Sequence, residues 1–543
     1  MVLLYRKLKD YKNRRRKQTM IYFVPAWNKK IQSGLSTDDL MGQIQSFMSS
    51  DVDYKILISD YMPELRYFLH RYDLLESSYV SIFDELQTIK HVEQKSLTLK
   101  DLNFPDTATF SYTPFNILVY QEEALIGQIT LGEASYISEV TYISGGKVTL
   151  VEIYDDRGFI SSRDIYEDGN FCYKEYLNQQ EHWVIRTYKD ATCEVNEEYS
   201  AGLSQRYYES LEEIKFEKLE NYYEHLGADD SIIISLTEKN LPYFQKSKVL
   251  PKMTLSLFGN RLRSKTKTQK ELEEVTGQCF AVIVDSNQNM QKVKAFTEES
   301  KIHRISPYDT RFELSRSHEL KEEVIYFESR DMTKEAIGQS IEILFSYLVD
   351  VFDNCEVERS FRIIIRMASH PLISAFSAKI RALFIEKFPE EMPLVEELLP
   401  MLTGENSIDA TLLKKTNPEV KRVMQLWKSF ELQIINTDDE LFRIINETRL
   451  IIDLREEPDL FTQIVGISAG IPQINQVETE YVQAYKNGLV IADWTELYQG
   501  LSYYLDRLKH WQEARMFAVQ QIKKYSGVAL REKISQVLGG INE

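Results

Sequence analysis

The stretch that decides the fold is VGISAGIPQINQVETEYVQAYKNGLVIADWTELYQGL, residues 465–501. Small residues lead into an Ile-Pro pair, a short apolar strand follows, and a polar loop ends in Asn487 and Gly488. The apolar run 489–491 then predicts another strand, and Asp493 is a typical N-cap for the amphipathic helix behind it. This order of elements predicts the end of a Rossmann-like α/β domain.

Strands and helices alternate on both sides of a central β-rich segment. Residues 21–27 and 54–59 predict buried strands, and helix N-cap candidates lie between them at 36–39. A second series of strands begins near residue 323. Its candidate strands are 324–327, 361–365, 430–435 and 449–453. This alternation predicts two parallel sheets covered by helices.

The segment from about residue 100 to 205 has a different pattern. Turn clusters begin at residues 155, 167, 178 and 189, and runs rich in Val, Ile, Tyr and Phe lie between them. Regular turns between β-forming runs predict an antiparallel meander inserted into the first α/β domain. For its aromatic residues we expect cross-strand packing, with stacking on sugar rings or on a partner as the alternative. The aromatic residues concerned are Tyr154, Tyr166, Tyr176 and Trp183.

Length and charge limit the classes of function. The chain has 543 residues, enough for two domains and an insertion, and its formal net charge is −18. Residues 1–20 hold eight Lys or Arg against Asp10 alone and are +7, so the remainder carries −25. An acidic body repels the phosphates of nucleic acid, and we exclude nucleic acid as a partner.

The positions of cysteine, histidine and apolar residues exclude further classes of structure and site. The four cysteines, Cys172, Cys193, Cys279 and Cys355, form no C-x-x-C pair, and we expect free thiols in a reducing cytoplasm. No apolar run approaches the roughly 20 residues that span a bilayer. The histidines show no H-x-x-x-H pair and the sequence has no P-loop, so we expect neither a metal nor a cofactor.

The basic segment 1–19 has two interpretations. The first is a polybasic tether to an anionic membrane, in which each Lys or Arg near the surface adds about 1 kcal/mol. The second, which we favour, is an upstream start, because Met20 directly precedes the first predicted strand. We therefore expect a cytoplasmic protein with at most peripheral attachment to the inner face of the membrane.

From about residue 320 onward the chain resembles the second domain of glycosyltransferases of the GT-B type. Those domains close with a helix ending in small residues and Gly-x-Pro, a short strand, an Asn-Gly loop, a strand and an Asp-capped helix. The resemblance implies an α/β, GT-B-like fold with two Rossmann-like domains facing a cleft. Active retaining members carry a Glu seven residues before the proline and another seven residues earlier. Here these positions hold Val465 and Pro458, whose side chains accept no hydrogen bond from a donor ribose.

The same resemblance points to one vestige of a donor site. Active relatives use an Arg and a Lys after the first strand of the second domain to neutralise the donor diphosphate, and Arg330 and Lys334 lie in a comparable place. The alternative is that both are ordinary surface charges near a helix start. The nearby acids Glu456, Glu457 and Asp459 allow a shifted register for the missing Glu. We expect no catalytic residue, with an active retaining glycosyltransferase as the rival hypothesis.

Three segments of the sequence point to a more specific family. Residues 22–27 (YFVPAW), 65–70 (LRYFLH) and 464–474 (IVGISAGIPQI) are similar to the first of the accessory Sec system proteins of Gram-positive bacteria, over roughly residues 20–543. That family acts in the cytosol in the export of glycosylated serine-rich repeat adhesins. The resemblance implies a non-catalytic adaptor that binds two other accessory Sec proteins, the accessory Sec ATPase and the adhesin, with glycan contact. The alternative is a glycosyltransferase that modifies the adhesin from a nucleotide-sugar donor.

We expect six segments along the chain. They are a basic extension (1–19), the first Rossmann-like domain in two parts (20–99 and 206–320), the inserted β-rich domain (100–205), the second Rossmann-like domain (321–510) and C-terminal helices that cross back (511–543). The fold class expected is therefore α/β with an inserted antiparallel meander.

Overall fold

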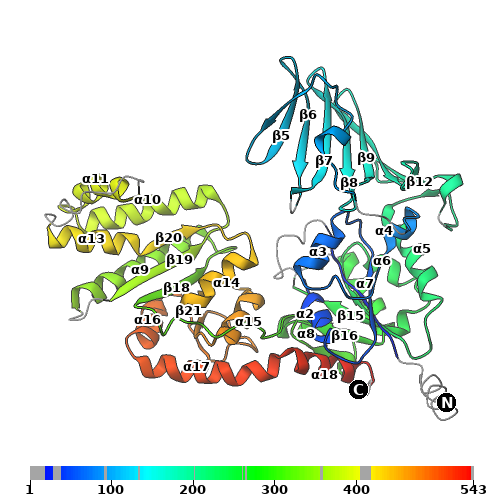
Figure 1. Ribbon diagram of the computed structural model, residues 1–543. Coiled ribbons are helices and arrows are strands. Elements are labelled where there is room, and N and C mark those ends of the chain that lie inside the picture. Colours follow the sequence, from blue (N-terminus) through cyan, green and yellow to red (C-terminus); the bar gives the residue numbers. More distant parts are fainter. Residues whose placement is uncertain are drawn as a thin grey trace, which may run out of the picture. The chain divides into compact units, whose positions relative to one another are not determined.

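The computed structural model in Figure 1 describes residues 19–28, 38–90, 95–132, 135–200, 202–259, 261–262, 266–354, 359–403 and 417–539. The chain divides into two compact units. The first unit contains residues 38–307 and 531–539 with the described N-terminal strand, and the second contains residues 308–530. The basic extension lies outside the described residues apart from Thr19. No described helix is both long and apolar enough to cross a membrane.

The first unit is built on a seven-stranded parallel sheet in the order β17-β16-β15-β14-β1-β2-β3. Its strands are β1 (Ile21–Val24), β2 (Tyr54–Ile58), β3 (Tyr79–Ser81), β14 (Ser231–Ser235), β15 (Met253–Leu257), β16 (Ala281–Val284) and β17 (Ile302–Arg304). Its helices are α2 (Met41–Phe47), α3 (Leu65–Arg71), α4 (Ile82–Leu86), α5 (Leu211–Tyr223), α6 (Leu241–Phe244), α7 (Thr266–Gln278) and α8 (Asn287–Lys294). The central strands β1 and β15 are buried along their whole length, because helices cover both faces of a parallel sheet. Since β1 lies between β14 and β2, the strand order reverses there, which opens a crevice at the carboxyl ends of these strands.

The inserted segment forms a ten-stranded antiparallel sheet whose strands follow one another in chain order, shown in cyan in Figure 1. The strands are β4 (Thr109–Tyr112), β5 (Asn116–Gln121), β6 (Ala124–Leu131), β7 (Ile137–Ser144), β8 (Lys147–Tyr154), β9 (Ile160–Glu167), β10 (Asn170–Leu177), β11 (Trp183–Tyr188), β12 (Cys193–Val195) and β13 (Tyr207–Tyr208). The predicted meander is therefore confirmed.

Ion pairs connect this sheet to helices α3 and α4 of the same unit. Arg66 of α3 binds Asp155, with Nη2 and Oδ1 2.9 Å apart, in the turn between β8 and β9. Arg157 of that turn binds Asp84 of α4 over 2.8 Å between Nη2 and Oδ1. Both Arg side chains are mostly buried, so these pairs are screened less than surface pairs.

The aromatic residues of the insertion pack within the protein. Tyr154 and Tyr176 are each 5 % exposed. Tyr166 meets Phe171 edge to face on the neighbouring strand, with ring centroids 5.7 Å apart. The Arg186 guanidinium covers Trp183, 4.0 Å from its ring centroid. Cross-strand packing, the expectation for these rings, accounts for their positions.

The second unit has a six-stranded parallel sheet in the order β20-β19-β18-β21-β22-β23. Its strands are β18 (Glu322–Glu328), β19 (Ser360–Arg366), β20 (Phe430–Gln433), β21 (Thr448–Asp453), β22 (Gln473–Asn475) and β23 (Gly488–Val490). Its helices are α9 (Lys334–Asn354), α10 (His370–Lys387), α11 (Met392–Thr403), α13 (Pro418–Lys428), α14 (Asp438–Glu447), α15 (Leu460–Ala469), α16 (Leu497–Leu505) and α17 (Leu508–Ile522), and α18 (Gly527–Val537) follows. Two Rossmann-like units with an inserted antiparallel sheet confirm the predicted fold class.

Glycines in the deciding stretch allow elements to pack closely. A Cβ on Gly466 of α15 would lie 2.5 Å from Gln473 Nε2 on β22. A Cβ on Gly488 of β23 would lie 2.5 Å from the backbone oxygen of Gln473. Gly470 ends α15 with φ 70°, a left-handed conformation that favours glycine. In this chain the small residues of the stretch therefore serve helix and strand packing.

Candidate functional site

Three charged residues end neighbouring strands of the second unit's sheet. Glu328 ends β18, Arg366 ends β19 and Asp453 ends β21, and the strand register places Glu328 beside both of the others. Carboxyl ends of parallel strands form the usual ligand edge of such a sheet. All three side chains are buried, with exposed fractions of 0 %, 8 % and 1 %.

Glu328 is the centre of this cluster. Its two carboxylate oxygens accept hydrogen bonds from Arg330 Nε (2.9 Å) and Nη2 (3.0 Å), and Oε2 also accepts from the Tyr326 hydroxyl (2.9 Å) and Arg366 Nη1 (3.3 Å). Burial alone would raise the pKa of Glu328, but the Arg330 hydrogen bond and the charges of Arg455, Arg330 and Arg366 outweigh it and lower that pKa. Glu328 is therefore held as a carboxylate at neutral pH.

Arg330, the predicted phosphate ligand, already has an internal counter-ion. Its guanidinium makes a two-pronged pair with Glu328, and Nη2 also lies 3.9 Å from Asp459 Oδ2. Burial would lower the pKa of Arg330, but Glu328 raises it above its ordinary value. The cation is thus fixed and neutralised by the protein, which leaves little charge for a diphosphate.

A second internal pair completes the cluster. Arg455 donates from Nε to Asp453 Oδ1 (2.8 Å) and from Nη2 to Oδ2 (2.7 Å). The backbone N–H of Asp459 also donates to Asp453, over 2.9 Å. Arg330, Arg366 and Arg455 are therefore all paired at the sheet edge with Glu328, Asp453 and Asp459. Arg455 Nη1 also lies 4.0 Å from the exposed carboxylate of Asp331, so the cluster has no excess positive charge.

The structure separates the other predicted site residues. Val465 is 1 % exposed inside α15. Pro458 is half-buried and directly precedes Asp459, which caps α15 by accepting from the Thr462 N–H. Lys334 is exposed at the start of α9 and makes no ion pair with a residue that the structure describes. Of these predicted positions, Arg330 lies near Pro458 only through Asp459, whose Oδ2 is 3.9 Å from Arg330 Nη2.

The acids of the shifted register lie on the surface. Glu456 and Glu457 are both exposed in the segment between β21 and α15. Their neighbour Asp459 has its side chain engaged at the N-terminus of α15, where Oδ2 accepts from Thr462 Oγ1 (2.5 Å).

Gly466, Ser468 and Gly470 also have the G-x-S-x-G spacing of serine hydrolases, a match that the sequence reasoning missed. In that motif the serine lies on a strained turn after a strand. Ser468 instead lies inside α15 with 0 % exposure. Its Oγ accepts from the Phe312 N–H (2.9 Å) and donates to the Phe312 carbonyl oxygen (3.0 Å). Ser468 therefore fastens a neighbouring segment and is not a nucleophile.

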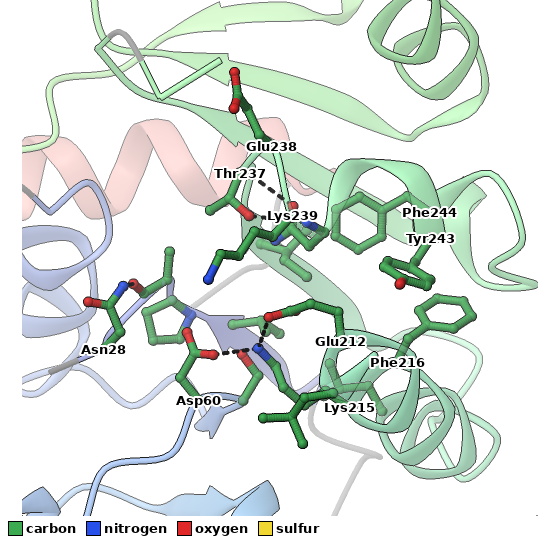
Figure 2. Close-up of a pocket in the computed structure, with 18 of the residues that line it drawn as sticks. Asn28, Asp60, Glu212, Lys215, Phe216, Thr237, Glu238, Lys239, Tyr243 and Phe244 are labelled. Atoms are coloured by element: carbon green, nitrogen blue, oxygen red, sulfur yellow. Dashed lines mark hydrogen bonds and ion pairs between the residues drawn. The ribbon is translucent and has the colours of Figure 1, made fainter. Parts of the chain in front are cut away.

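The first unit contains a cavity of about 740 Å³ at the crevice where its strand order reverses (Figure 2). Its walls come from the segments that follow β1, β2 and β14, namely residues 25–28, 59–61 and 237–240, and from α5. This is where a doubly wound sheet binds ligands. The size suits a small organic molecule such as one or two sugar rings.

The cavity combines charged groups with aromatic rings. Lys215 of α5 is 6 % exposed and forms ion pairs with Asp60 and with Glu212, the latter over 2.9 Å between Nζ and Oε1. Burial would lower the pKa of Lys215, but the two carboxylates raise it. Phe216 and Tyr243 form an aromatic wall with ring centroids 5.5 Å apart (Figure 2).

These cavity residues were not predicted from the sequence. Asp60 follows the predicted strand 54–59 directly, which was a usable signal, because residues just after a strand line the ligand edge. Lys215 and Glu212 lie on a helix more than 150 residues away, and no local pattern links them to Asp60. Among the residues that the structure describes, no group of three or more His, Cys, Asp or Glu could hold a metal ion.

Comparisons with known proteins agree with this architecture. The family model for accessory Sec system protein ASP1, the first of these proteins, matches residues 12–540. The curated protein of that family from Streptococcus gordonii is 31 % identical over 537 residues, which cover 94 % of this chain and 97 % of the relative.

Two solved structures are also similar. The crystal structure of accessory secretory proteins 1, 2 and 3 of Streptococcus pneumoniae contains a chain with a TM-score of 0.76 and 26 % identity, covering 96 % of this chain and 99 % of that one. The pneumococcal O-GlcNAc transferase GtfA, solved with UDP and GlcNAc, has a TM-score of 0.59 at 13 % identity over 96 % of this chain and 99 % of its own, which shows the GT-B fold alone. Because its family model spans nearly the whole sequence, the chain belongs to the family of the first accessory Sec system protein.

Proposed function

We propose that this protein is a non-catalytic, glycosyltransferase-like adaptor for the export of glycosylated serine-rich repeat adhesins. The observation that carries the proposal is the closed charge cluster at the sheet edge of the second unit. Glu328 takes both prongs of the Arg330 guanidinium, and the position expected for a donor-binding Glu holds the buried Val465. A nucleotide sugar would have to displace an internal ion pair and would find no carboxylate at position 465 for its ribose.

The adaptor role rests on the family and on the cavity of the first unit. A relative of 26 % identity was solved together with two other accessory secretory proteins. We infer that this chain assembles with the corresponding two proteins and, with them, serves the accessory Sec ATPase and the adhesin. Such a complex works on the cytoplasmic side, with at most peripheral contact with the membrane.

The cavity supplies a place for the glycan of the adhesin. Carboxylates, amides and an ammonium group can exchange hydrogen bonds with sugar hydroxyls, and Phe216 and Tyr243 offer faces on which a sugar ring can stack. Binding without donor chemistry is what an adaptor for a glycosylated chain requires.

Isothermal calorimetry with UDP-sugars at millimolar concentration is expected to show no binding heat, and the melting temperature should not rise with added nucleotide sugar. The physical reason is the neutralised Arg330. An active glycosyltransferase serves as the positive control for both assays. Transfer of a sugar from a nucleotide donor to a serine-rich peptide would overturn the adaptor proposal, and loss of that transfer in Glu456→Gln or Glu457→Gln would establish the enzyme.

Phe216→Ala is expected to weaken binding of a glycosylated serine-rich repeat peptide roughly fivefold, because an aromatic stacking contact contributes about 1 kcal/mol. The matched control is Tyr207→Ala, which removes an aromatic ring that is 61 % exposed on β13 outside the cavity. Fluorescence anisotropy with glycosylated and unmodified peptides measures both variants. Equal affinity of Phe216→Ala and wild type would exclude the cavity as the glycan site.

A further inference from the structure

A groove of about 550 Å³ lies along one face of α17 in the second unit. Figure 1 labels this helix. Its walls include Trp511, Arg515, Met516 and Val519 from α17 and His318 from a preceding loop. Met516 is 64 % exposed and Val519 is 40 % exposed, so the groove presents apolar surface to solvent. These α17 positions follow helical spacing and line about three turns of one helix face.

Arg515 is held firmly in this groove. A Cβ placed on Gly470 would lie 3.3 Å from Arg515 Cγ, so the glycine makes room for the Arg515 stem. The guanidinium lies 5.3 Å from the ring centroid of Trp511. Nη1 donates to His318 Nδ1 (3.1 Å), and Nη2 donates to the Ser315 carbonyl oxygen (3.5 Å). The cation is therefore positioned before any partner arrives, which reduces the entropic cost of binding.

Arg515 pairs with no carboxylate in the described part of the chain; its contacts are the imidazole of His318, the Ser315 carbonyl oxygen and the Trp511 ring. A second cation, Arg449, lies 4.5 Å from the same Trp511 ring and has Glu323 at 3.4 Å. Burial lowers the pKa of Arg515. Burial also lowers the pKa of Arg449; Glu323 opposes this, and the neighbouring arginines Arg359 and Arg515 reinforce it. An excess positive charge thus lies at one wall of an apolar groove.

We infer that this groove binds an amphipathic helix of a companion protein in the accessory Sec complex, with a carboxylate paired to Arg515 and apolar side chains on Met516 and Val519. The inference rests on the proposed function. A partially desolvated cation with apolar neighbours favours a carboxylate flanked by apolar residues, and a straight helix face about three turns long favours a helix as the occupant.

Other occupants fit the charge less well. A two-fold contact between copies of this chain would place Arg515 against the same groove of the partner copy, so one cation would face another. The basic segment at the start of this chain also has the wrong sign for Arg515. An acidic helix from another protein satisfies both the charge and the apolar surface.

The test uses the full chain and its two companion proteins purified as a complex. Arg515→Glu and Met516→Asp are each expected to weaken assembly on the order of 30-fold or more, measured as a dissociation constant by biolayer interferometry. Arg515→Lys should retain most of the affinity because it keeps the charge. The matched control is Leu394→Asp, a similar change at an apolar residue of α11 that is 39 % exposed. Thermal unfolding of each variant shows that it is folded.

Hydroxyl-radical labelling of Met516 provides an independent readout. We expect strong labelling in the isolated chain and protection in the complex. Unchanged affinity of both groove variants, or equal labelling with and without the companions, would overturn the inference. Protection in the isolated chain would also overturn it, because the chain itself or a second copy, detected by light scattering, would then fill the groove. If the wild-type chain does not assemble with the companions at all, the proposed function fails first.

Discussion

Glu328→Ala is expected to lower the free energy of unfolding by about 3–5 kcal/mol, because removal of one partner leaves buried charges without compensation. Glu328 is 0 % exposed and accepts from Arg330, Arg366 and Tyr326. Its loss leaves two guanidinium groups at the sheet edge without their shared carboxylate. Urea denaturation followed by circular dichroism measures the change.

Two variants control this experiment. Glu342→Ala removes a carboxylate of α9 whose pair with Lys379 is partly exposed, with side chains 47 % and 36 % accessible, and should cost less than 1 kcal/mol. Glu328→Gln keeps a hydrogen-bond acceptor but loses the charge, and its cost should lie between the other two. Equal stability of Glu328→Ala and Glu342→Ala would show that the cluster does not hold the sheet edge together.

The same pair makes part of the stability depend on pH. The folded pKa of Glu328 lies below the value of about 4.3 for an unfolded glutamate, so its contribution is present above that pH and is lost as the pH falls through the folded pKa. Asp453 acts in the opposite sense, because burial raises its folded pKa. The stability difference between wild type and Glu328→Ala should therefore be constant above about pH 5 and shrink below about pH 4.

The sequence predicted the folding units better than it predicted the site. Strand and helix patterns are local, and they indicated both parallel sheets and the meander between them. Arg366 donates to Glu328 from the neighbouring strand β19, and the register places Asp453 of β21 beside it, so these neighbours are not local in sequence. Arg330 was expected to face a phosphate, and its pairing with Glu328, only two residues before it, is a local contact that the sequence reasoning missed. Whether an arginine is free or already paired depends on the fold.

Val465 was identified as a lost donor-site position from its distance along the sequence to Pro472. Counting from Pro472 identifies the position at which active relatives carry a Glu, and the residue there is apolar. The structure adds that α15 is buried from Phe461 to Ala469, so a carboxylate at this position would require a different environment as well as a different residue. Substitution of Val465 by Glu would therefore bury a charge rather than restore a donor site.

Gly488→Ala is expected to cost about 3 kcal/mol, at the upper end of the range for overpacking. The new Cβ would lie 2.5 Å from the backbone oxygen of Gln473 on the neighbouring strand β22 and would also overlap Val482. A backbone atom in a hydrogen-bonded parallel ladder cannot move away as a flexible side chain can. β22 and β23 must therefore separate, which breaks the end of the sheet that the deciding stretch forms. Thermal unfolding by differential scanning calorimetry measures the loss.

The control for Gly488→Ala is the same substitution at Gly277 in α7, where a Cβ would meet no atom within 4 Å. Alanine has the higher helix propensity, so Gly277→Ala should be neutral or stabilising by up to about 1 kcal/mol. The same substitution should therefore change the free energy of unfolding in opposite directions at the two glycines, because only Gly277 has room for a Cβ. If Gly488→Ala were as stable as wild type, the close approach of β22 and β23 would not be what requires a glycine at this position.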